Sequence, residues 1–105
     1  HTAQVTFAAM DSEAFGQKIK KGQILGMEDG KITLVEDDIV NAAYRTARRL
    51  AKKYNASFIT VYYGEETDEA TAKRLSERLS ERFPNIEINV IPGGQPVYYF
   101  IISVE

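Results

Sequence analysis

Cysteine and tryptophan are absent from this chain, and its only histidine is the first residue, His1. Without cysteine there can be no disulfide bond and no thiolate metal site. A single histidine at a chain end also excludes a histidine-based zinc centre and a serine–histidine–aspartate triad. The longest apolar run lies near Val97–Ile102, which is far too short to span a bilayer, and no secretory signal is visible. We therefore expect no metal site and no membrane insertion.

A basic excess is missing as well. The sequence holds 13 Lys and Arg against 15 Asp and Glu, which gives a net charge of −2 and an isoelectric point near 5.5. Proteins that bind the phosphate backbone of nucleic acids usually carry a surplus of positive charge. We expect no nucleic-acid partner, and we interpret the cluster Arg45–Lys53 as a solvated helix face.

What the composition favours is one globular domain. Hydrophobic residues make up 44% of 105 residues, which is enough for a single core and not for two. Residues 1–105 are therefore predicted to form a single domain. Because the chain begins without a methionine, we expect it to be a fragment of a larger protein.

The first third of the chain predicts strands. Ala3–Met10 alternates loosely between apolar and polar residues, as a strand does. Asp11–Gly22 is polar and bounded by glycine, which predicts an irregular loop, with a short helical turn at Ser12–Phe15 as one option. The dipeptide Asp29-Gly30 separates two apolar segments, QILGM and KITLV, and this is the signature of a hairpin turn.

Two helices follow. The acids of Glu36–Asp38 open the first helix, which runs to about Tyr54 and stops at Asn55, a residue that tolerates a left-handed conformation. Thr67 is predicted to cap the second helix, and Pro84 ends it. In both helices the apolar residues recur at helical spacing, so each should bury one face.

The remaining strands determine the fold class. Ala56–Tyr63 and Ile86–Ile91 flank the second helix, so they should run parallel in a βαβ unit, with the latter near a sheet edge. The link Pro92–Pro96 is too short for a crossover, so the last strand, Val97–Val104, should return antiparallel. We predict an α/β (α+β) fold: a mixed sheet of about five to six strands with a βαβ unit, a hairpin and two main helices.

This topology gathers tyrosines and acids at one edge. The carboxyl ends of parallel strands share an edge of the sheet, which we call the carboxyl rim, and open sheets often bind ligands there. The residues expected at the carboxyl rim are Tyr62, Tyr63, Tyr98, Tyr99, Glu65, Glu66, Asp68, Glu69 and the loop Gly93–Pro96. Tyrosine combines apolar area with a polar group and is common at interfaces. The basic residues expected at the opposite pole are Arg48, Arg49, Lys52, Lys53, Arg78 and Arg82.

Simpler interpretations stay open for each of these features. Acids at helix starts are favoured by the helix dipole alone, the Gly93-Gly94 pair is common in hairpin loops, and the tyrosines could only pack the sheet. A phosphate loop is excluded because these glycines lead into a strand rather than a helix. Carboxylate catalysis by Asp37, Asp38 or Glu66 has no partner base or nucleophile to make it specific.

The closing stretch, GGQPVYYFIISVE, closely resembles the carboxyl-terminal end of the A-subunit family of bacterial fatty acid kinases, which is related to dihydroxyacetone kinase. Upstream, KKGQILGMEDGKI looks like the family's glycine-bounded hairpin, VYYGEETDEATA like its strand–turn–helix, and FPNIEINVIPGGQP like its approach to the last strand. The resemblance covers about Val5–Glu105. The positions that match the terminal motif are Gly93, Gly94, Gln95, Pro96, Tyr98 and Glu105.

The resemblance implies that this chain is the carboxyl-terminal part of a bacterial, cytoplasmic kinase subunit. ATP and magnesium would bind in a separate amino-terminal domain of the parent protein, so no cofactor is expected in this fragment. A partner subunit would bind the fatty acid and present its carboxylate. The kinase would then convert that carboxylate into an acyl phosphate for phospholipid synthesis.

Our first hypothesis is a non-catalytic domain that is inactive alone and docks the fatty-acid-binding subunit. The predicted docking residues are Gly93, Gly94, Gln95, Pro96, Tyr98, Tyr63, Glu65, Glu66 and Asp68. One alternative is a stand-alone small-molecule binding module or enzyme with a pocket at the carboxyl rim. Another is a structural domain that supports dimerisation of the parent kinase.

Overall fold

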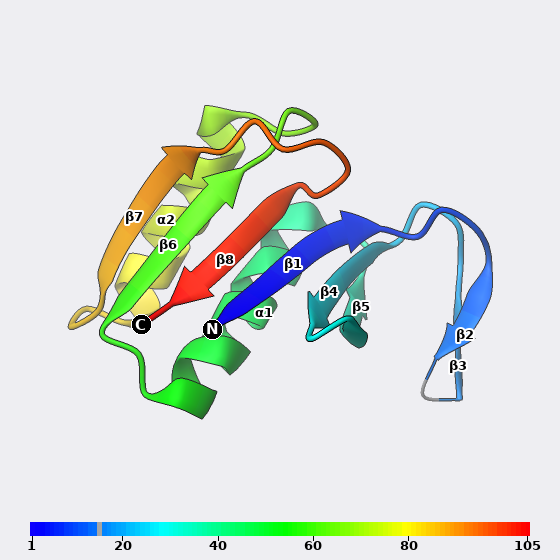
Figure 1. The fold of residues 1–105 in the computed structure, drawn as a ribbon, viewed down its shortest axis with the longest axis horizontal. Helices are drawn as coiled ribbons and strands as arrows, with labels where there is room; N and C mark the ends of the chain where they lie inside the picture. Colours follow the sequence, from blue (N-terminus) through cyan, green and yellow to red (C-terminus); the bar gives the residue numbers. More distant parts are fainter. Residues whose placement is uncertain (15) are drawn as a thin grey trace.

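The structure, a computed structural model, describes residues 1–14 and 16–105. Its elements are β1 (Thr2–Phe7), β2 (Ser12–Ala14), β3 (Gln17–Ile19), β4 (Ile24–Glu28), β5 (Lys31–Glu36), α1 (Ile39–Tyr54), β6 (Phe58–Tyr63), α2 (Glu69–Arg82), β7 (Glu87–Pro92) and β8 (Phe100–Val104). Six strands form one mixed sheet in the order β5-β4-β1-β8-β6-β7, and β2 and β3 pair separately (Figure 1). The predicted fold class is confirmed.

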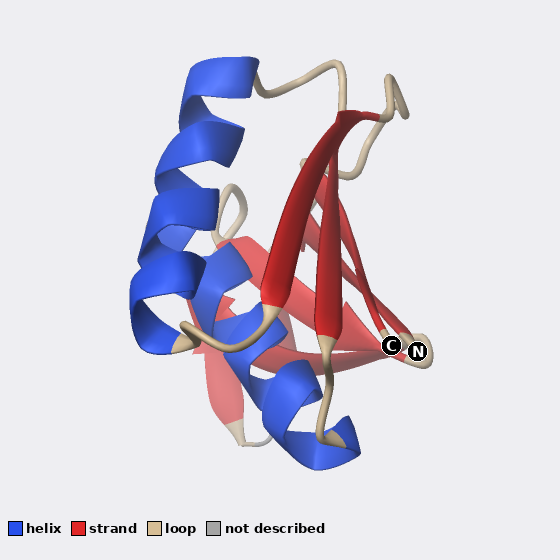
Figure 2. Ribbon diagram, turned by 90° about the vertical axis from the view of Figure 1, so that its left-hand side faces the viewer, coloured by secondary structure: helices blue, strands red, loops and turns tan. Residues whose placement is uncertain are grey.

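Both helices cover the same face of the sheet (Figure 2). On each strand, alternate residues point to opposite faces, and the apolar set under the helices is buried. The largest fully buried side chains of this core are Phe100, Leu50, Ile59, Leu75, Leu79, Ile102, Val5, Val61 and Val104. At Gly26 the helix comes so close that an added Cβ would collide with the Thr46 hydroxyl. Glycine is therefore required there for α1 to reach the sheet.

Both helices begin at an aspartate. Asp38 accepts the Asn41 backbone N–H at 2.7 Å, and Asp68 accepts the Thr71 N–H at 2.8 Å. The predicted start of α1 is confirmed, but the prediction of Thr67 as the second cap is wrong. Thr67 instead donates its backbone N–H to the Gly64 carbonyl in the preceding turn. Threonine and aspartate both suit a cap, so composition alone could not choose between neighbours.

The βαβ unit and the antiparallel last strand are confirmed. β6 pairs in parallel with β7, while β8 lies between β1 and β6 and is antiparallel to both. The last strand is shorter than predicted, because it begins at Phe100 rather than Val97. Val97 has φ of +71°, a left-handed conformation that does not continue a strand.

The hairpin of β4 and β5 also follows the prediction. Asp29 and Gly30 both have positive φ, 52° and 75°, as the tight hairpin turn requires. The prediction for Asp11–Gly22 is wrong, because β2 and β3 form a small antiparallel hairpin there. Residues 12–14 of the optional helical turn are strand, and Phe15 lies outside the described residues. β2 and β3 are each only three residues long. This is too short for the alternation of apolar and polar residues in a strand to be recognised in the sequence.

Candidate functional site

The carboxyl rim is held together by backbone hydrogen bonds between segments that are distant in sequence. Gly93 and Gly94 both donate their N–H groups to the Tyr63 carbonyl, at 2.9 and 3.2 Å. Gly64, directly after β6, donates to the Tyr99 carbonyl at 2.9 Å. The predicted meeting of the Gly93–Pro96 loop with the end of β6 is therefore present in the structure.

Gln95 joins several segments of the carboxyl rim through hydrogen bonds. Its side-chain amide nitrogen donates to the Tyr62 carbonyl at 3.0 Å and lies 3.4 Å from the Tyr98 carbonyl. Its own backbone carbonyl accepts the Glu65 N–H at 3.1 Å. An added Cβ at Gly93 would collide with the Gln95 amide oxygen. The glutamine side chain of the terminal motif is thus engaged within the domain, where it fixes the course of the loop.

A three-residue turn follows Gln95. The Tyr98 N–H donates to the Pro96 carbonyl at 2.8 Å, and Val97 between them has φ of +71°. The Thr6 hydroxyl donates to the Val97 carbonyl at 3.2 Å and ties the turn to β1. A β-branched residue with positive φ is strained, and such strain tends to collect at functional sites. The Val97 side chain is nevertheless 54% exposed. Burial in the core therefore does not explain why a valine occupies this strained position.

The four tyrosines of the carboxyl rim differ in their availability. Tyr98 is exposed, at 37% of its surface. Tyr63 and Tyr99 are partly buried against the core, and the Tyr99 ring packs on Phe7 with 6.0 Å between centroids. Tyr62 lies on the sheet face away from the helices and is partly buried. Tyr98 and Val97 are therefore the exposed apolar side chains of the loop.

Three acids stand beside this loop. Glu65, Glu66 and Asp68 lie directly before α2, and all three are exposed. The backbone N–H of Thr71, followed by its side chain and by the Arg74 charge, lowers the pKa of the Asp68 carboxyl. Asp68 therefore combines a structural role as helix cap with a permanent negative charge at neutral pH.

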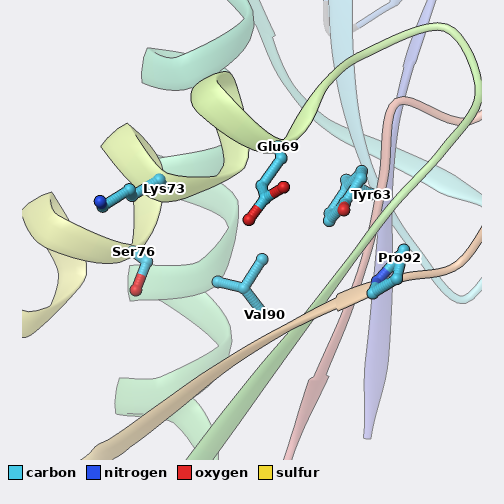
Figure 3. Close-up of a pocket in the computed structure, with 6 residues that line it drawn as sticks. All are labelled: Tyr63, Glu69, Lys73, Ser76, Val90 and Pro92. Atoms are coloured by element: carbon cyan, nitrogen blue, oxygen red, sulfur yellow. The ribbon is translucent and has the colours of Figure 1, made fainter.

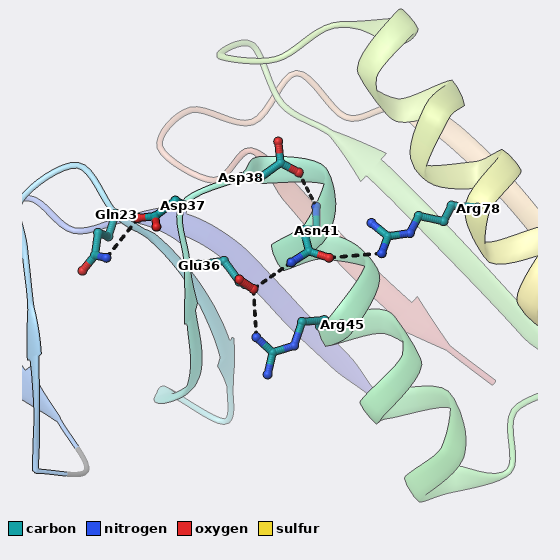
Figure 4. A network of polar contacts seen from close by, with 7 residues as sticks. All are labelled: Gln23, Glu36, Asp37, Asp38, Asn41, Arg45 and Arg78. Carbon is teal, nitrogen blue, oxygen red and sulfur yellow. Dashed lines mark hydrogen bonds and ion pairs between the residues drawn. The ribbon is translucent and has the colours of Figure 1, made fainter.

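The acids at the start of α1 are engaged in a separate network (Figure 4). Glu36 accepts from Asn41 at 2.7 Å and pairs with Arg45 at 2.9 Å, and Asp37 accepts from Gln23 at 3.0 Å. Arg78 of α2 donates to the Asn41 amide oxygen at 3.1 Å. Glu36 thus joins β5 to α1, and Asn41 joins α1 to α2, so these side chains serve contacts between elements of the fold.

Both helices carry basic residues, five on α1 and four on α2. Glu28 is buried at the far end of β4, where Arg49 pairs with it at 2.8 Å and Lys53 lies 3.8 Å away. Arg48 and Arg78 lie over the Tyr44 ring, at 5.4 and 4.0 Å from its centroid. The prediction that Arg78 lies at the opposite pole is wrong, because its guanidinium reaches Tyr44 and the first turn of the neighbouring helix.

A pocket of about 240 Å³ opens beside the carboxyl rim, between α2 and the β6–β7 pair (Figure 3). It is lined by Tyr63, Val90, Pro92, Glu69, Lys73 and Ser76. In Figure 3 the Glu69 carboxylate points into this space, whereas the Lys73 ammonium points away. Lys73, Ser76 and Val90 are site residues that the sequence reasoning missed. The signal it could have used is the Glu69–Lys73 spacing, which places both on one helix face above β7.

The described residues contain no group of three His, Cys, Asp or Glu side chains that could hold a metal ion. In the same part of the chain, no helix is long and apolar enough to cross a membrane. What the site offers is an exposed apolar turn, a row of acids and a small pocket on one edge. This arrangement suits recognition of another surface.

Fold and site together define a small α+β domain whose exposed features lie at one sheet edge. The chain belongs to the family of C-terminal domains that resemble the A-subunit of fatty acid kinase, which it matches over residues 1–105. It is 32% identical to Protein YloV of Bacillus subtilis over 104 residues and 31% identical to an uncharacterized protein of Staphylococcus haemolyticus over 107. A relative from Staphylococcus aureus is 26% identical over 104 residues. Each match covers 99% of this chain but 19% of the relative, so the chain spans about a fifth of their length.

Proposed function

We propose that this chain is a non-catalytic domain of a fatty acid kinase and that its carboxyl rim docks the subunit that binds the fatty acid. The parent protein would supply ATP and magnesium from another domain and would form the acyl phosphate. The observation that carries the proposal is the turn at Val97 and Tyr98. Two exposed apolar side chains lie there, and the first of them, Val97, has a strained backbone conformation.

The surroundings of the turn support a protein partner. Aromatic side chains at the centre of an interface commonly contribute most of the binding free energy, and Tyr98 has the exposure and position for this role. Glu65, Glu66 and Asp68 would attract a basic surface and raise the association rate. The pocket behind Tyr63 can receive one partner side chain.

The size of that pocket weighs against a small-molecule site at the carboxyl rim. Pockets for drug-sized ligands usually measure about 300–1,000 Å³, whereas this one measures about 240 Å³ and is bordered by only six residues. A dimerisation role has no specific observation in its favour. Docking is therefore the function that the exposed turn supports best.

The proposal is tested with Tyr98→Ala in the 105-residue chain, using calorimetry against the partner subunit loaded with a long-chain fatty acid. Truncation should weaken binding about tenfold or more if Tyr98 is central, which corresponds to about 1.4 kcal/mol. Phe58→Ala is the matched control, because Phe58 is a similarly exposed aromatic residue that lies away from the carboxyl rim. Equal affinity of Tyr98→Ala and wild type would rule out docking through this turn.

A further inference from the structure

The sheet face opposite the helices carries a row of side chains that crosses all six strands. Strand register aligns one residue from each strand: Ile91, Tyr62, Ile101, Gln4, Met27 and Ile32. Five of these six are apolar or aromatic, although they lie on the face that the helices leave uncovered. We call this side of the sheet the open face.

The two ends of the open face differ. At the β4–β5 end, Leu25 is buried with Ile19 of the small hairpin, and Met27 and Ile32 pack against them. At the β6–β7 end, Thr60 and Tyr62 are half-buried, but the side chains on either side of them are more open. Phe58 is 46% exposed and Ile91 is 41% exposed.

The uncovered end has the composition of an interface. Phe58 and Ile91 are accompanied by hydroxyl and amide side chains, among them Thr60, Ser103 and Asn89 on the same face. Two charged residues flank Phe58, because Glu87 is its register partner on β7 and Glu105 pairs with it on the other side. Interfaces between domains of one polypeptide combine apolar and polar surface in this way.

The length of the relatives and the family description indicate which part of the parent polypeptide covers this end of the open face. The relatives are about five times longer, and the family is described as a C-terminal one, so most of the parent polypeptide would precede these residues. His1 lies directly before the central strand β1 and exchanges hydrogen bonds with Val104 of β8. Phe58 lies one strand further on, where it pairs with Glu105. Preceding residues would thus enter about 10 Å from Phe58, two strand spacings away.

We propose that the exposed end of the open face, which extends along the β6–β7 pair from Phe58 to Ile91, packs against the part of the parent polypeptide that precedes this domain. The complementary surface is apolar opposite Phe58 and Ile91 and carries hydrogen-bonding groups for Thr60 and Ser103. The sheet then becomes the middle layer between the two helices and the preceding domain. Phe58 lies at the opposite end of β6 from the carboxyl rim, whereas Ile91 borders that rim through its register partner Tyr62. The contact does not depend on the proposed docking function.

The test uses the full-length parent protein with a specific protease site placed just before the position of His1. After cleavage, the wild-type 11.8 kDa fragment should co-elute with the remainder in size-exclusion chromatography. The double substitution Phe58→Lys with Ile91→Lys should release the fragment. Phe58→Thr with Ile91→Thr, which keeps strand propensity, should weaken co-elution without unfolding the fragment, as its melting curve would show.

Tyr98→Lys is the matched control, because it adds a charge at an exposed aromatic residue of the carboxyl rim. It should leave co-elution intact while it weakens binding of the fatty-acid-binding partner. The proposal is overturned if the wild-type fragment elutes alone or as a dimer of itself. It is also overturned if a folded Phe58 and Ile91 variant still co-elutes with the remainder.

Discussion

The last part of the chain contains two neighbouring regions that differ in regularity and burial. β8, from Phe100 to Val104, is regular and central, and its helix-facing side chains are fully buried. The residues before it, Gly93–Tyr99, have no regular structure, and they expose Val97 and Tyr98. The strand stabilises the fold, and the loop is held in place by hydrogen bonds that present its side chains. If the docking proposal holds, stability and recognition are separable within one short stretch.

The largest expected effect sharpens this contrast within β8. Ile102→Ala should lower the free energy of unfolding by about 2–5 kcal/mol, because the side chain is fully buried and leaves a cavity. Its neighbour Ile101 faces the other side of the sheet and is only partly buried. In urea denaturation, Ile101→Ala should lower the free energy of unfolding by less than half as much as Ile102→Ala. Equal losses would mean that the two faces of β8 do not differ in packing.

An intermediate effect is expected at Gln95. Gln95→Ala removes the donor to the Tyr62 carbonyl and should lower the free energy of unfolding by about 1 kcal/mol. Gln95→Glu keeps the shape of the side chain but loses the donor at neutral pH, so it should destabilise at least as much. Thermal melts of both variants provide the measurement. If both melt like the wild type, Gln95 does not brace the loop.

A smaller effect is expected from pH at Asp68. Because the pKa of Asp68 is lowered in the folded state, its contribution to stability is present above the unfolded pKa and is lost as the pH falls through the folded pKa. Asp68→Asn retains a capping side chain without this titration. As the pH falls from neutral to about 3, below the ordinary pKa of aspartate, the melting temperature of the wild type should therefore fall by more than that of Asp68→Asn. An identical loss would exclude Asp68 as a source of acid sensitivity.

We expect ATP and magnesium not to bind to this chain. The chain has no glycine-rich loop that leads into a helix, and the described residues lack a metal-binding acidic cluster. Calorimetry with ATP and magnesium should give no heat of binding to the 105-residue chain. Binding in the micromolar range would contradict the division of labour on which the docking proposal depends.

Much of the strand region could be predicted from local signals. Asp29-Gly30 and Asn55 adopt the positive φ values that their residue types tolerate, and the order of strands and helices follows from link lengths. The role of Gln95 could not be predicted, because its carbonyl acceptor belongs to Tyr62, 33 residues away. The conformation of Val97 could not be predicted for the opposite reason, because the local signal there is misleading. Valine strongly disfavours positive φ, so its sequence favours the strand that the structure does not form there.

Val97 also provides the most direct test of the docking proposal. Glycine adopts positive φ freely, so Val97→Gly relieves strain worth about 1–3 kcal/mol. The added freedom of the unfolded chain costs only about 0.4–1 kcal/mol. The same substitution removes an exposed apolar side chain beside Tyr98. We predict a melting temperature equal to or above that of the wild type, together with at least about fivefold weaker binding to the partner that carries the fatty acid. Unchanged affinity in a stable Val97→Gly domain would contradict docking through the carboxyl rim.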